Sequence, residues 1–371
     1  MREGWEYKKL GECTQILDSQ RKPVTKKDRK EGVYPYYGAT GIQDYVDKYI
    51  FDGRYVLVGE DGAKWGAFDK SAFIIDGKTW VNNHAHVLKP FEPLVDSYLT
   101  YYLNHSDLNG FISGAIVRKL TQSSLKNIKI PLPPKSTQLA IVSELDKINE
   151  LIRLKKEQLK DFDNLAQSIF YEMFGDPVEN EKGWEVKKLN DISQEIGDGL
   201  HGTPEYSDVD TGCFFINGNN LENGIIVIKD NTKTVSEKTK AKHYIEMDDF
   251  TILVSINGTL GKVAFYRGEN VILGKSACYI KLTSYNDKKY IYELLKSEYF
   301  KRYAETECTG TTIRNVSLKS MRNFPIPLPP LPLQHLFAHR IEQIEHQKAE
   351  VQKAITDLET LLASRMQYWF E

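Results

Sequence analysis

Residues 130–134, IPLPP, are followed by a long stretch that lacks glycine and proline, residues 136–174, STQLAIVSELDKINELIRLKKEQLKDFDNLAQSIFYEMF. A second IPLPP at residues 326–330 precedes another long stretch that runs to residue 371. In both stretches apolar residues recur in steps of three and four over more than four heptads, which is the pattern of a coiled coil. The sequence therefore predicts two long helices, each after a proline cluster that we expect to close a globular part, because proline cannot continue a ladder or a helix interior.

The apolar positions form two rows on each predicted helix. In the first stretch the rows are Leu145, Ile152, Leu159, Ala166 and Met173, and Ile141, Ile148, Lys155, Phe162 and Ile169. In the second they are Ile341, Lys348, Ile355, Leu362 and Trp369, and Phe337, Ile344, Val351, Leu358 and Arg365. Each helix, a rod of ~58 Å at ~1.5 Å per residue, must bury this stripe. We expect the two helices to pair; the alternative is that each packs along its own globular part.

The rest of the chain is also duplicated, which indicates a repeat architecture. GWEYKKL at 4–10 returns as GWEVKKL at 183–189, and SGAIVR at 113–118 resembles TGTTIR at 309–314. Short β-rich runs lie between these motifs, separated by Gly, Asn and Asp turn signals. They include residues 55–58, 73–75, 214–216 and 224–228. The chain is therefore interpreted as two copies of a unit of roughly 180 residues.

These patterns predict an α+β protein in which two duplicated α/β domains are joined by two long helices that form an antiparallel coiled coil. We expect the first domain at 1–134, the central helix at 135–175, the second domain at 176–330 and the C-terminal helix at 331–371. Gly175, Asp176 and Pro177 are a typical end for the first helix.

Composition narrows the functional classes. The net charge is −2 over 371 residues, so the chain is not a simple basic nucleic-acid binder. No apolar run approaches the ~20 residues of a spanning helix, and no signal peptide is visible. The four cysteines form no CxxC pair, which favours reduced thiols in the cytoplasm. The dense basic run at 21–30 is either a solvated loop or a nucleic-acid contact.

Motifs for catalysis or cofactor binding are weak. GDGLHG at 197–202 matches GxGxxG, but Pro204 follows and no helical period is present. GKS at 274–276 lacks the upstream glycine of a phosphate-binding loop. His84 and His86 would lie on one face of a strand, yet no third metal ligand has sensible spacing, so hydrogen bonding is favoured. We therefore expect no catalytic residue, cofactor or metal in this chain.

The repeated motifs, in this order and twice over, resemble the specificity subunits of type I restriction–modification enzymes. Two further stretches are similar to the target-recognition domains of that family, YYGATGI at 36–42 and GDGLHGTPEY at 197–206. The resemblance implies two inverted domains that each recognise one half of an asymmetric bipartite DNA site. It also implies two methyltransferase subunits that bind the helices and bring S-adenosylmethionine, and motor–nuclease subunits that use ATP and Mg²⁺. No membrane partner is expected.

Candidate DNA contacts are polar side chains and residues of glycine-rich turns, since these donate to base edges and phosphates. In the first domain they are Lys22 (toward phosphate), Tyr37, Thr40, Lys64, Asn83, His84 and Arg118. In the second they are His201, Thr203, Tyr206, Asn217, Asn219, Asn220, Asn257, Lys275 and Arg314. For the asparagines, ordinary turn geometry is an equal alternative. Arg118 and Arg314 occupy equivalent points, which favours a shared phosphate or partner contact, or a structural ion pair.

Two other functions remain open. The chain could serve a methyltransferase that has no nuclease partner. From a different class, it could be a non-catalytic coiled-coil scaffold whose globular parts bind protein or glycan; the glycine- and asparagine-rich loops of both copies disfavour this. The DNA target itself is beyond sequence analysis.

Overall fold

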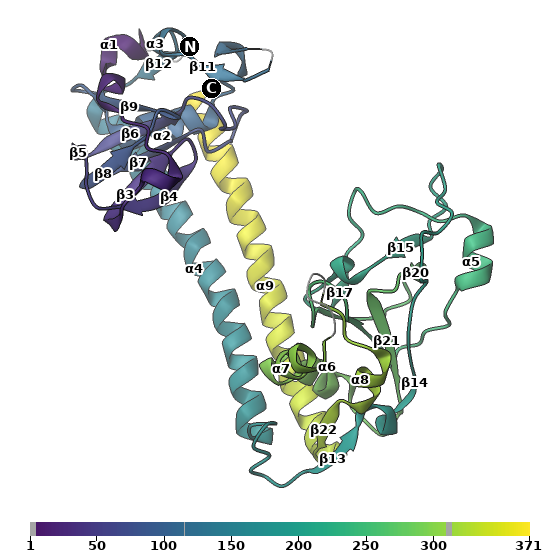
Figure 1. The fold of residues 1–371 in the computed structure, drawn as a ribbon. Coiled ribbons are helices and arrows are strands. Elements are labelled where there is room, and N and C mark those ends of the chain that lie inside the picture. Colours follow the sequence, from purple (N-terminus) through teal and green to yellow (C-terminus); the bar gives the residue numbers. More distant parts are fainter. Residues whose placement is uncertain (1–4, 115, 309–313) are drawn as a thin grey trace. The chain divides into compact units, whose positions relative to one another are not determined.

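The computed structural model describes residues 5–114, 116–308 and 314–371 (Figure 1). It divides into two compact units: unit 1, Met1–Gln158 with Val351–Glu371, and unit 2, Leu159–Glu350. Each unit holds one copy of the duplicated segment and part of both long helices. Gly4, Ala115 and residues 309–313 of the repeated motifs lie outside the described residues.

Unit 1 contains two four-stranded sheets. The first is antiparallel with the order β2-β9-β6-β7, and the second has the order β4-β3-β8-β5 with β3 and β8 parallel. The strands are β2 (Thr14–Ile16), β3 (Glu31–Gly38), β4 (Gly41–Val46), β5 (Phe51–Asp52), β6 (Tyr55–Gly59), β7 (Ala72–Ile75), β8 (Lys78–Val81) and β9 (Ala85–Pro90). Val56, Leu57 and Val58 of β6 are fully buried because both faces of this strand are covered.

Unit 2 repeats the four-stranded antiparallel sheet, whereas its second sheet consists of two parallel strands. Its antiparallel sheet has the order β14-β21-β18-β19, and β15 pairs in parallel with β20. The strands are β14 (Ser193–Asp198), β15 (Phe214–Ile216), β16 (Leu221–Glu222), β17 (Ile225–Ile226), β18 (Thr251–Ser255), β19 (Val263–Phe265), β20 (Val271–Leu273) and β21 (Ala277–Leu282). The predicted β-rich runs thus form strands in both units, although the run at 224–228 contributes only β17.

The opening motif and the proline cluster of each copy pair with each other. β1 (Glu6–Lys9) is antiparallel to β12 (Lys129–Leu132), with Tyr7 opposite Pro131. β13 (Glu185–Lys188) pairs in the same way with β22 (Pro325–Leu328). The proline cluster does end each globular part, but the expectation that proline cannot continue a ladder is wrong for its first residues. They form a strand of a two-stranded sheet, where a proline without an N–H is tolerated, and only the last two prolines end it.

Short helices complete each unit. They are α1 (Leu10–Cys13), α2 (Asp96–His105) and α3 (Gln122–Lys126) in unit 1, and α5 (Glu237–His243), α6 (Lys288–Lys296), α7 (Glu298–Glu307) and α8 (Leu318–Asn323) in unit 2. The equivalent helices α3 and α8 begin alike, because Thr121 Oγ1 accepts from the Ser124 amide and Ser317 Oγ accepts from the Ser320 amide.

The two predicted long helices are present as α4 (Lys135–Phe174) and α9 (Leu331–Phe370). Gly175 follows α4 with a φ of +77°, the left-handed conformation that ends a helix without strain only at glycine. Among the described residues, no helix combines the length and the apolar character needed to cross a membrane.

Within each unit the two helices run antiparallel and bury the predicted rows. In unit 1, Glu144 accepts hydrogen bonds from Arg365 and from Trp369 Nε1, and Lys156 lies 2.8 Å from Glu359. In unit 2, Lys348 Nζ lies 2.6 Å from Asp163 Oδ1. Two of the three polar interruptions of the rows thus bond to the opposite helix.

The helices also pack on the globular parts. Leu145 and Met366 join the core of unit 1, and Phe170, Phe174 and Phe337 join that of unit 2. The paired helices and the packing of helix against domain are therefore both present.

Candidate nucleic-acid interface

Three segments meet at one side of each globular part and form what we call the loop edge. In unit 1 they are the residues after β6 (60–64), before β9 (82–84) and before α3 (118–120). The amide of Glu60 donates to His84 O (2.8 Å), and the amide of Leu120 donates to Glu60 O (2.8 Å). In unit 2 the equivalent segments are residues 256–260, 274–276 and 314–316, and the same bonds join Ile256 to Ser276 O (3.1 Å) and Val316 to Ile256 O (2.9 Å).

This equivalence relates the candidate residues of the two copies. The amide of Asn82 donates to Tyr37 O in unit 1, as the amide of Gly274 donates to Ile216 O in unit 2. Counting along the matched strands therefore pairs Asn83 with Lys275, Thr40 with Asn219, and Arg118 with Arg314. Asn83 and Lys275, and likewise Arg118 and Arg314, were chosen separately in each copy and lie at equivalent points of the loop edge.

Most candidates of unit 1 are exposed at its loop edge. Thr40 is in the turn between β3 and β4, and Lys22, Lys64 and Asn83 are exposed. His84 Nδ1 lies 2.5 Å from Asp61 Oδ1. Tyr37 is half-buried against Phe73, and burial raises the pKa of its hydroxyl. Arg118 donates to Asn109 Oδ1 (2.5 Å), which leaves it at the end of the edge.

A buried charge cluster, which sequence reasoning missed, lies beneath this edge. Arg21, only 12% exposed, donates to Glu60 (2.5 Å) and to the carbonyl of Ala85 (2.8 Å), and it pairs with Asp18 (3.4 Å). Lys119 lies 2.7 Å from the other oxygen of Glu60. Arg21 thereby joins the first residue of β9 to the residues after β6.

The pKa values of the two acids reflect this pairing. Burial alone would raise the pKa of Asp18, but hydrogen bonds and charges from His86, the Val87 amide and Arg21 outweigh it and lower that pKa. Burial would likewise raise the pKa of Glu60, but hydrogen bonds from Lys119 and Arg21 outweigh it, so that this pKa is lowered. Both carboxylates are therefore held ionised.

The two histidines do not share a strand face as expected. His84 precedes β9 and is exposed, whereas His86 is buried beside Asp18 and Glu60. Sequence spacing offered no third metal ligand, yet the fold brings these three side chains together. They do not fit a metal ion, because His86 Nε2 donates to Leu120 O (2.7 Å) and Nδ1 faces Asp18 (2.5 Å), while Arg21 and Lys119 already neutralise the carboxylates.

Several candidates of unit 2 lie in or beside its loop edge. His201 Nε2 lies 2.7 Å from Asp198, and the amide of Lys275 donates to Leu200 O (3.1 Å). Asn217 Oδ1 accepts from Ser276 Oγ (3.0 Å). The candidate Thr203, farther along the loop, is exposed.

Asn257 and Arg314 complete the edge. Asn257 Nδ2 donates to Asn315 Oδ1 (3.3 Å), and the Arg314 carbonyl accepts from Gly258 N (3.0 Å). The Arg314 side chain lies 2.8 Å from Glu305. Neither Arg118 nor Arg314 is buried, so both guanidinium groups are accessible.

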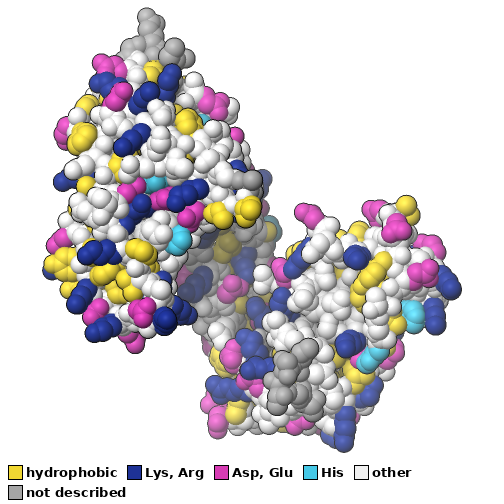
Figure 2. Space-filling view, turned by 45° about the horizontal axis from the view of Figure 1, so that its top comes forward, with side chains coloured by type: hydrophobic (Ala, Val, Ile, Leu, Met, Phe, Trp, Pro, Cys, Tyr) yellow, Lys and Arg dark blue, Asp and Glu magenta, His cyan; other side chains and the backbone are white. Residues whose placement is uncertain are grey.

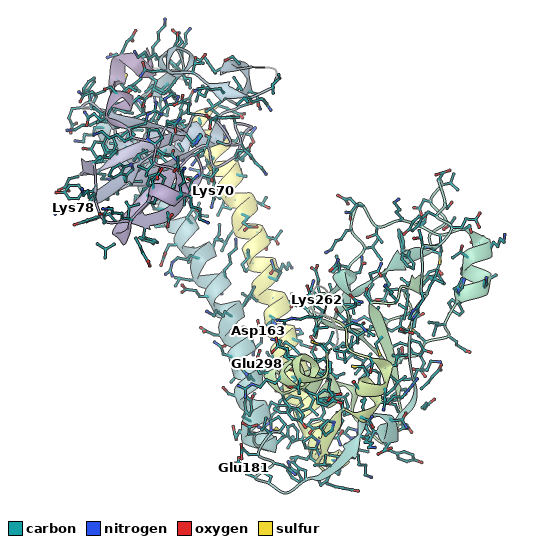
Figure 3. The ribbon with its side chains drawn as sticks, in the orientation of Figure 1. Lys70, Lys78, Asp163, Glu181, Lys262 and Glu298 are labelled. Atoms are coloured by element: carbon teal, nitrogen blue, oxygen red, sulfur yellow. The ribbon has the colours of Figure 1, made fainter. Side chains whose placement is uncertain are left out.

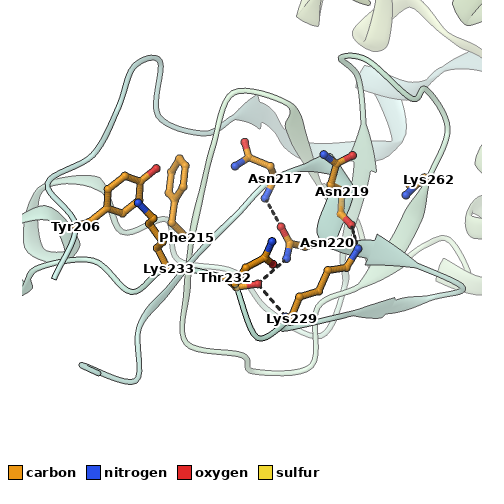
Figure 4. A pocket seen from close by; sticks show the side chains of 10 residues that line it. Tyr206, Phe215, Asn217, Asn219, Asn220, Lys229, Thr232, Lys233 and Lys262 are labelled. Carbon is orange, nitrogen blue, oxygen red and sulfur yellow. Dashed lines mark hydrogen bonds between the residues drawn. The ribbon is translucent and has the colours of Figure 1, made fainter. Parts of the chain in front are cut away.

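A polar pocket of about 440 Å³ opens beside the edge of unit 2 (Figure 4). Tyr206, Asn217, Asn219 and Asn220 line it together with residues that the sequence did not single out. Asn220 is buried, and its amide donates to Val227 O (2.9 Å) while its oxygen accepts from the Asn217 amide (3.0 Å). Its bonds are those of turn geometry, and it supports the loop that carries the other side chains.

Lysine and arginine side chains are interspersed with acidic ones over the face shown in Figure 2. This agrees with the near-neutral composition of 49 basic and 51 acidic residues. This face therefore carries no broad basic field.

Comparison with known proteins identifies the family. The family described as the type I restriction modification DNA specificity domain matches residues 2–161 and 181–360, the two copies found above. A putative type I restriction enzyme specificity subunit of Haemophilus influenzae is 29% identical over 92% of this chain and 87% of its own length. The MjaVIII specificity subunit of Methanocaldococcus jannaschii is 22% identical over 97% of this chain and 92% of its own.

Solved structures show the same fold. The S subunit of a type I restriction–modification system from M. genitalium has a TM-score of 0.56 at 16% identity, with 99% of this chain and 96% of that one covered. A chain from a study of complex assembly and conformational transition of the type I R-M system has a TM-score of 0.60 at 17% identity, with 100% and 98% covered. Two matched domains and whole-chain relatives lead to one conclusion: the chain belongs to the family of type I restriction–modification DNA specificity subunits.

Proposed function

We propose that this chain selects an asymmetric, two-part DNA target and directs partner subunits to it. The observation that carries the proposal is the pair of loop edges. Both are built by the same backbone hydrogen bonds, yet they carry different side chains, such as Asn83 and His84 in unit 1 against Lys275 and Ser276 in unit 2. Different donors and acceptors on one architecture recognise different base sequences.

The partners in this proposal are two methyltransferase subunits, which bring S-adenosylmethionine, and motor–nuclease subunits, which use ATP and Mg²⁺. The complex works in the cytoplasm, and the present chain contributes no catalytic group. Support comes from the family and from the near-neutral charge. Since lysine and arginine contacts to phosphate supply most non-specific affinity, a chain with net charge −2 requires partners that hold the duplex.

The test is to express the chain with its methyltransferase partner in a host that lacks adenine methylation, and to map methylated adenines. We expect one bipartite motif with a fixed unspecified spacer, which disappears when this chain is omitted. Purified chain alone should show no methylation, ATPase or nuclease activity. A contiguous motif, or methylation that persists without this chain, would contradict the proposal.

A further inference from the structure

The pocket of unit 2 combines ten side chains from separate segments of the chain. They are Tyr206, Phe215, Asn217, Asn219, Asn220, Lys229, Asn231, Thr232, Lys233 and Lys262. None is acidic, although acidic residues outnumber basic ones in the chain. Its volume of about 440 Å³ falls within the range of ligand sites, ~300–1,000 Å³.

The three lysines of the pocket differ in their partners. Lys229 is bound to Glu222 (2.7 Å) and to the carbonyl of Asn219 (3.0 Å). Its hydrogen bond and charge, with a smaller contribution from the charge of Lys262, lower the pKa of Glu222. The Lys233 ammonium lies 4.6 Å from the ring centroid of Tyr206. Across residues 5–114, 116–308 and 314–371, neither Lys233 nor Lys262 has an ion pair. Lys262, labelled in Figure 3, is the last residue of the loop between β18 and β19.

The neutral donors of the pocket divide into supporting and unengaged groups. Asn220 and Thr232 hold the loop: the Lys229 amide donates to Thr232 Oγ1 (2.9 Å), and Asn220 bonds to Val227 O. Among the side chains that the structure describes, those of Asn219 and Asn231 make no hydrogen bond, and both residues are exposed. Two amides and two ammonium groups thus face one space, an arrangement that suits an anion with several acceptor oxygens.

We propose that this pocket binds a backbone phosphate of the DNA target, with Lys233 and Lys262 as the charged contacts and Asn219 and Asn231 as hydrogen-bond donors. This deepens the proposed function and rests on it. The pocket adjoins the loop edge through Asn217, which both lines the pocket and bonds to Ser276. A strand recognised at the edge therefore passes the pocket with its phosphates.

The pocket belongs to unit 2 because of a local insertion. In unit 1, β3 turns into β4 through Ala39 and Thr40, and β4 pairs along β3. In unit 2, residues 217–233 separate β15 from the segment that pairs with it, where Phe214 lies opposite Thr234. This longer connection provides most of the lining side chains. We therefore expect the phosphate contact to act on one half-site only.

The test compares wild-type and variant forms of the full-length chain, each in complex with its methyltransferase partners. The variants are Lys233→Gln with Lys262→Gln, the charge-conserving Lys233→Arg with Lys262→Arg, and the control Lys187→Gln. Lys187 is on β13, away from the β15–β17 region of the unit (Figure 1). Binding to a target duplex and to a duplex of equal length without the target is measured at several salt concentrations.

The glutamine variant should bind both duplexes more weakly by the same factor, about tenfold at ~0.1 M salt for each phosphate that the lysines no longer bind. For each such phosphate the slope of log K against log salt should fall by about 0.9. The arginine variant should retain the wild-type slope.

A slope equal to that of Lys187→Gln would overturn the proposal. So would weaker binding of the target duplex alone, which indicates base recognition. Loss of methyltransferase binding with an unchanged salt slope would also overturn the proposal, because it would show that the lysines contact carboxylates of the partner protein and not DNA phosphates.

The experiment tests the proposed function and the phosphate contact independently. If wild-type complex did not distinguish the two duplexes, sequence selection would be wrong, while the slope on either duplex would still decide the phosphate contact.

Discussion

Units 1 and 2 place different chemistry at the same interior positions. Ala85 lies opposite Gly59 and Ala277 lies opposite Ser255, so His86 and Cys278 are equivalent, as are Glu60 and Ile256. In unit 1 these positions hold part of a hydrogen-bonded charge cluster; in unit 2 both are buried and neither is charged. Burial raises the pKa of the Cys278 thiol, which keeps it protonated.

The loop edges are consequently stabilised by different means. Arg21 joins two loops of unit 1 through carboxylates and carbonyls, and it contacts Asp18 three residues earlier. In unit 2 His201 likewise contacts Asp198 three residues earlier, but its side chain is exposed. In unit 2 the hydroxyl of Ser276 joins the loop edge to the residues after β15: its Oγ donates to Asn217 Oδ1 and accepts from the Gly218 amide (2.9 Å). The comparison teaches that the same sheet order places the loops in both units, while the buried residues that support the loops differ between the units as the loops themselves do.

The largest expected effect comes from exchanging one unit's globular part. Because β1 pairs with β12, residues 1–134 close on themselves and can be replaced as a block by the same region of a relative. We expect one half-site to change completely and the other to stay, as judged by methylated-adenine mapping. A change in both half-sites would show that the units do not act separately.

A second change removes one heptad from each helix. α4 and α9 run without a break from one unit into the other, and Lys156 faces Glu359. Deleting 153–159 together with 354–360 keeps the apolar rows in phase. At ~1.5 Å per residue it removes about 10 Å of helix, on the order of 3 base pairs at ~3.4 Å each.

The half-sites should stay the same while the unspecified spacer changes by about that number. A library of targets with randomised spacers measures this. Deleting two residues from each helix instead should impair folding, since the rows would no longer face each other. An unchanged spacer after the heptad deletion would mean that the helices do not determine it.

Arg21→Gln and His201→Gln form a matched pair, because each removes a side chain that contacts an aspartate three residues earlier. Removing Arg21 leaves two buried carboxylates with fewer partners, which should cost unit 1 about 3–5 kcal/mol of unfolding free energy. His201 is 70% exposed on its side chain, so its loss should cost unit 2 at most about 1 kcal/mol. Hydrogen exchange of peptides from β6 and β18 reports each unit. Equal costs would show that the buried cluster does not stabilise unit 1.

The smallest effect is a difference in acid sensitivity. Asp18 and Glu60 have lowered pKa values in the folded state, so their contribution is complete above the unfolded pKa of about 4 and is lost as the pH falls through the folded values. Glu293 of unit 2 has the opposite shift, because burial raises its pKa. Protonation at low pH therefore removes the free-energy cost of burying its charge.

Between about pH 6 and pH 3, protection from hydrogen exchange, corrected for the intrinsic rate, should therefore fall more in β6 than in β18. In Glu60→Gln this difference should narrow. A steeper loss in β18 would contradict the assignment of the buried acids.

The sequence by itself determined the duplication, the two long helices and the family. These features follow from patterns that can be recognised along the chain: heptad rows, repeated motifs and proline clusters. An apolar stripe on a helix must be buried against some partner surface, so the pattern predicts the helix without specifying that partner. Even the candidates Asn83 and Lys275 could be chosen from the sequence, because polar residues in turns beside buried strands are exposed by the strand geometry.

Only the tertiary structure decided which distant residues meet. Asp18, Glu60, His86 and Lys119 form one cluster because β2, β6 and β9 are neighbours in a sheet, and no spacing along the chain indicates that order. The pocket beside Asn217 likewise depends on how residues 217–233 fold back on β15. The sequence shows which residues a loop offers; the sheet order decides which of them share a site, because hydrogen-bonded strand pairing joins segments that are remote in the chain.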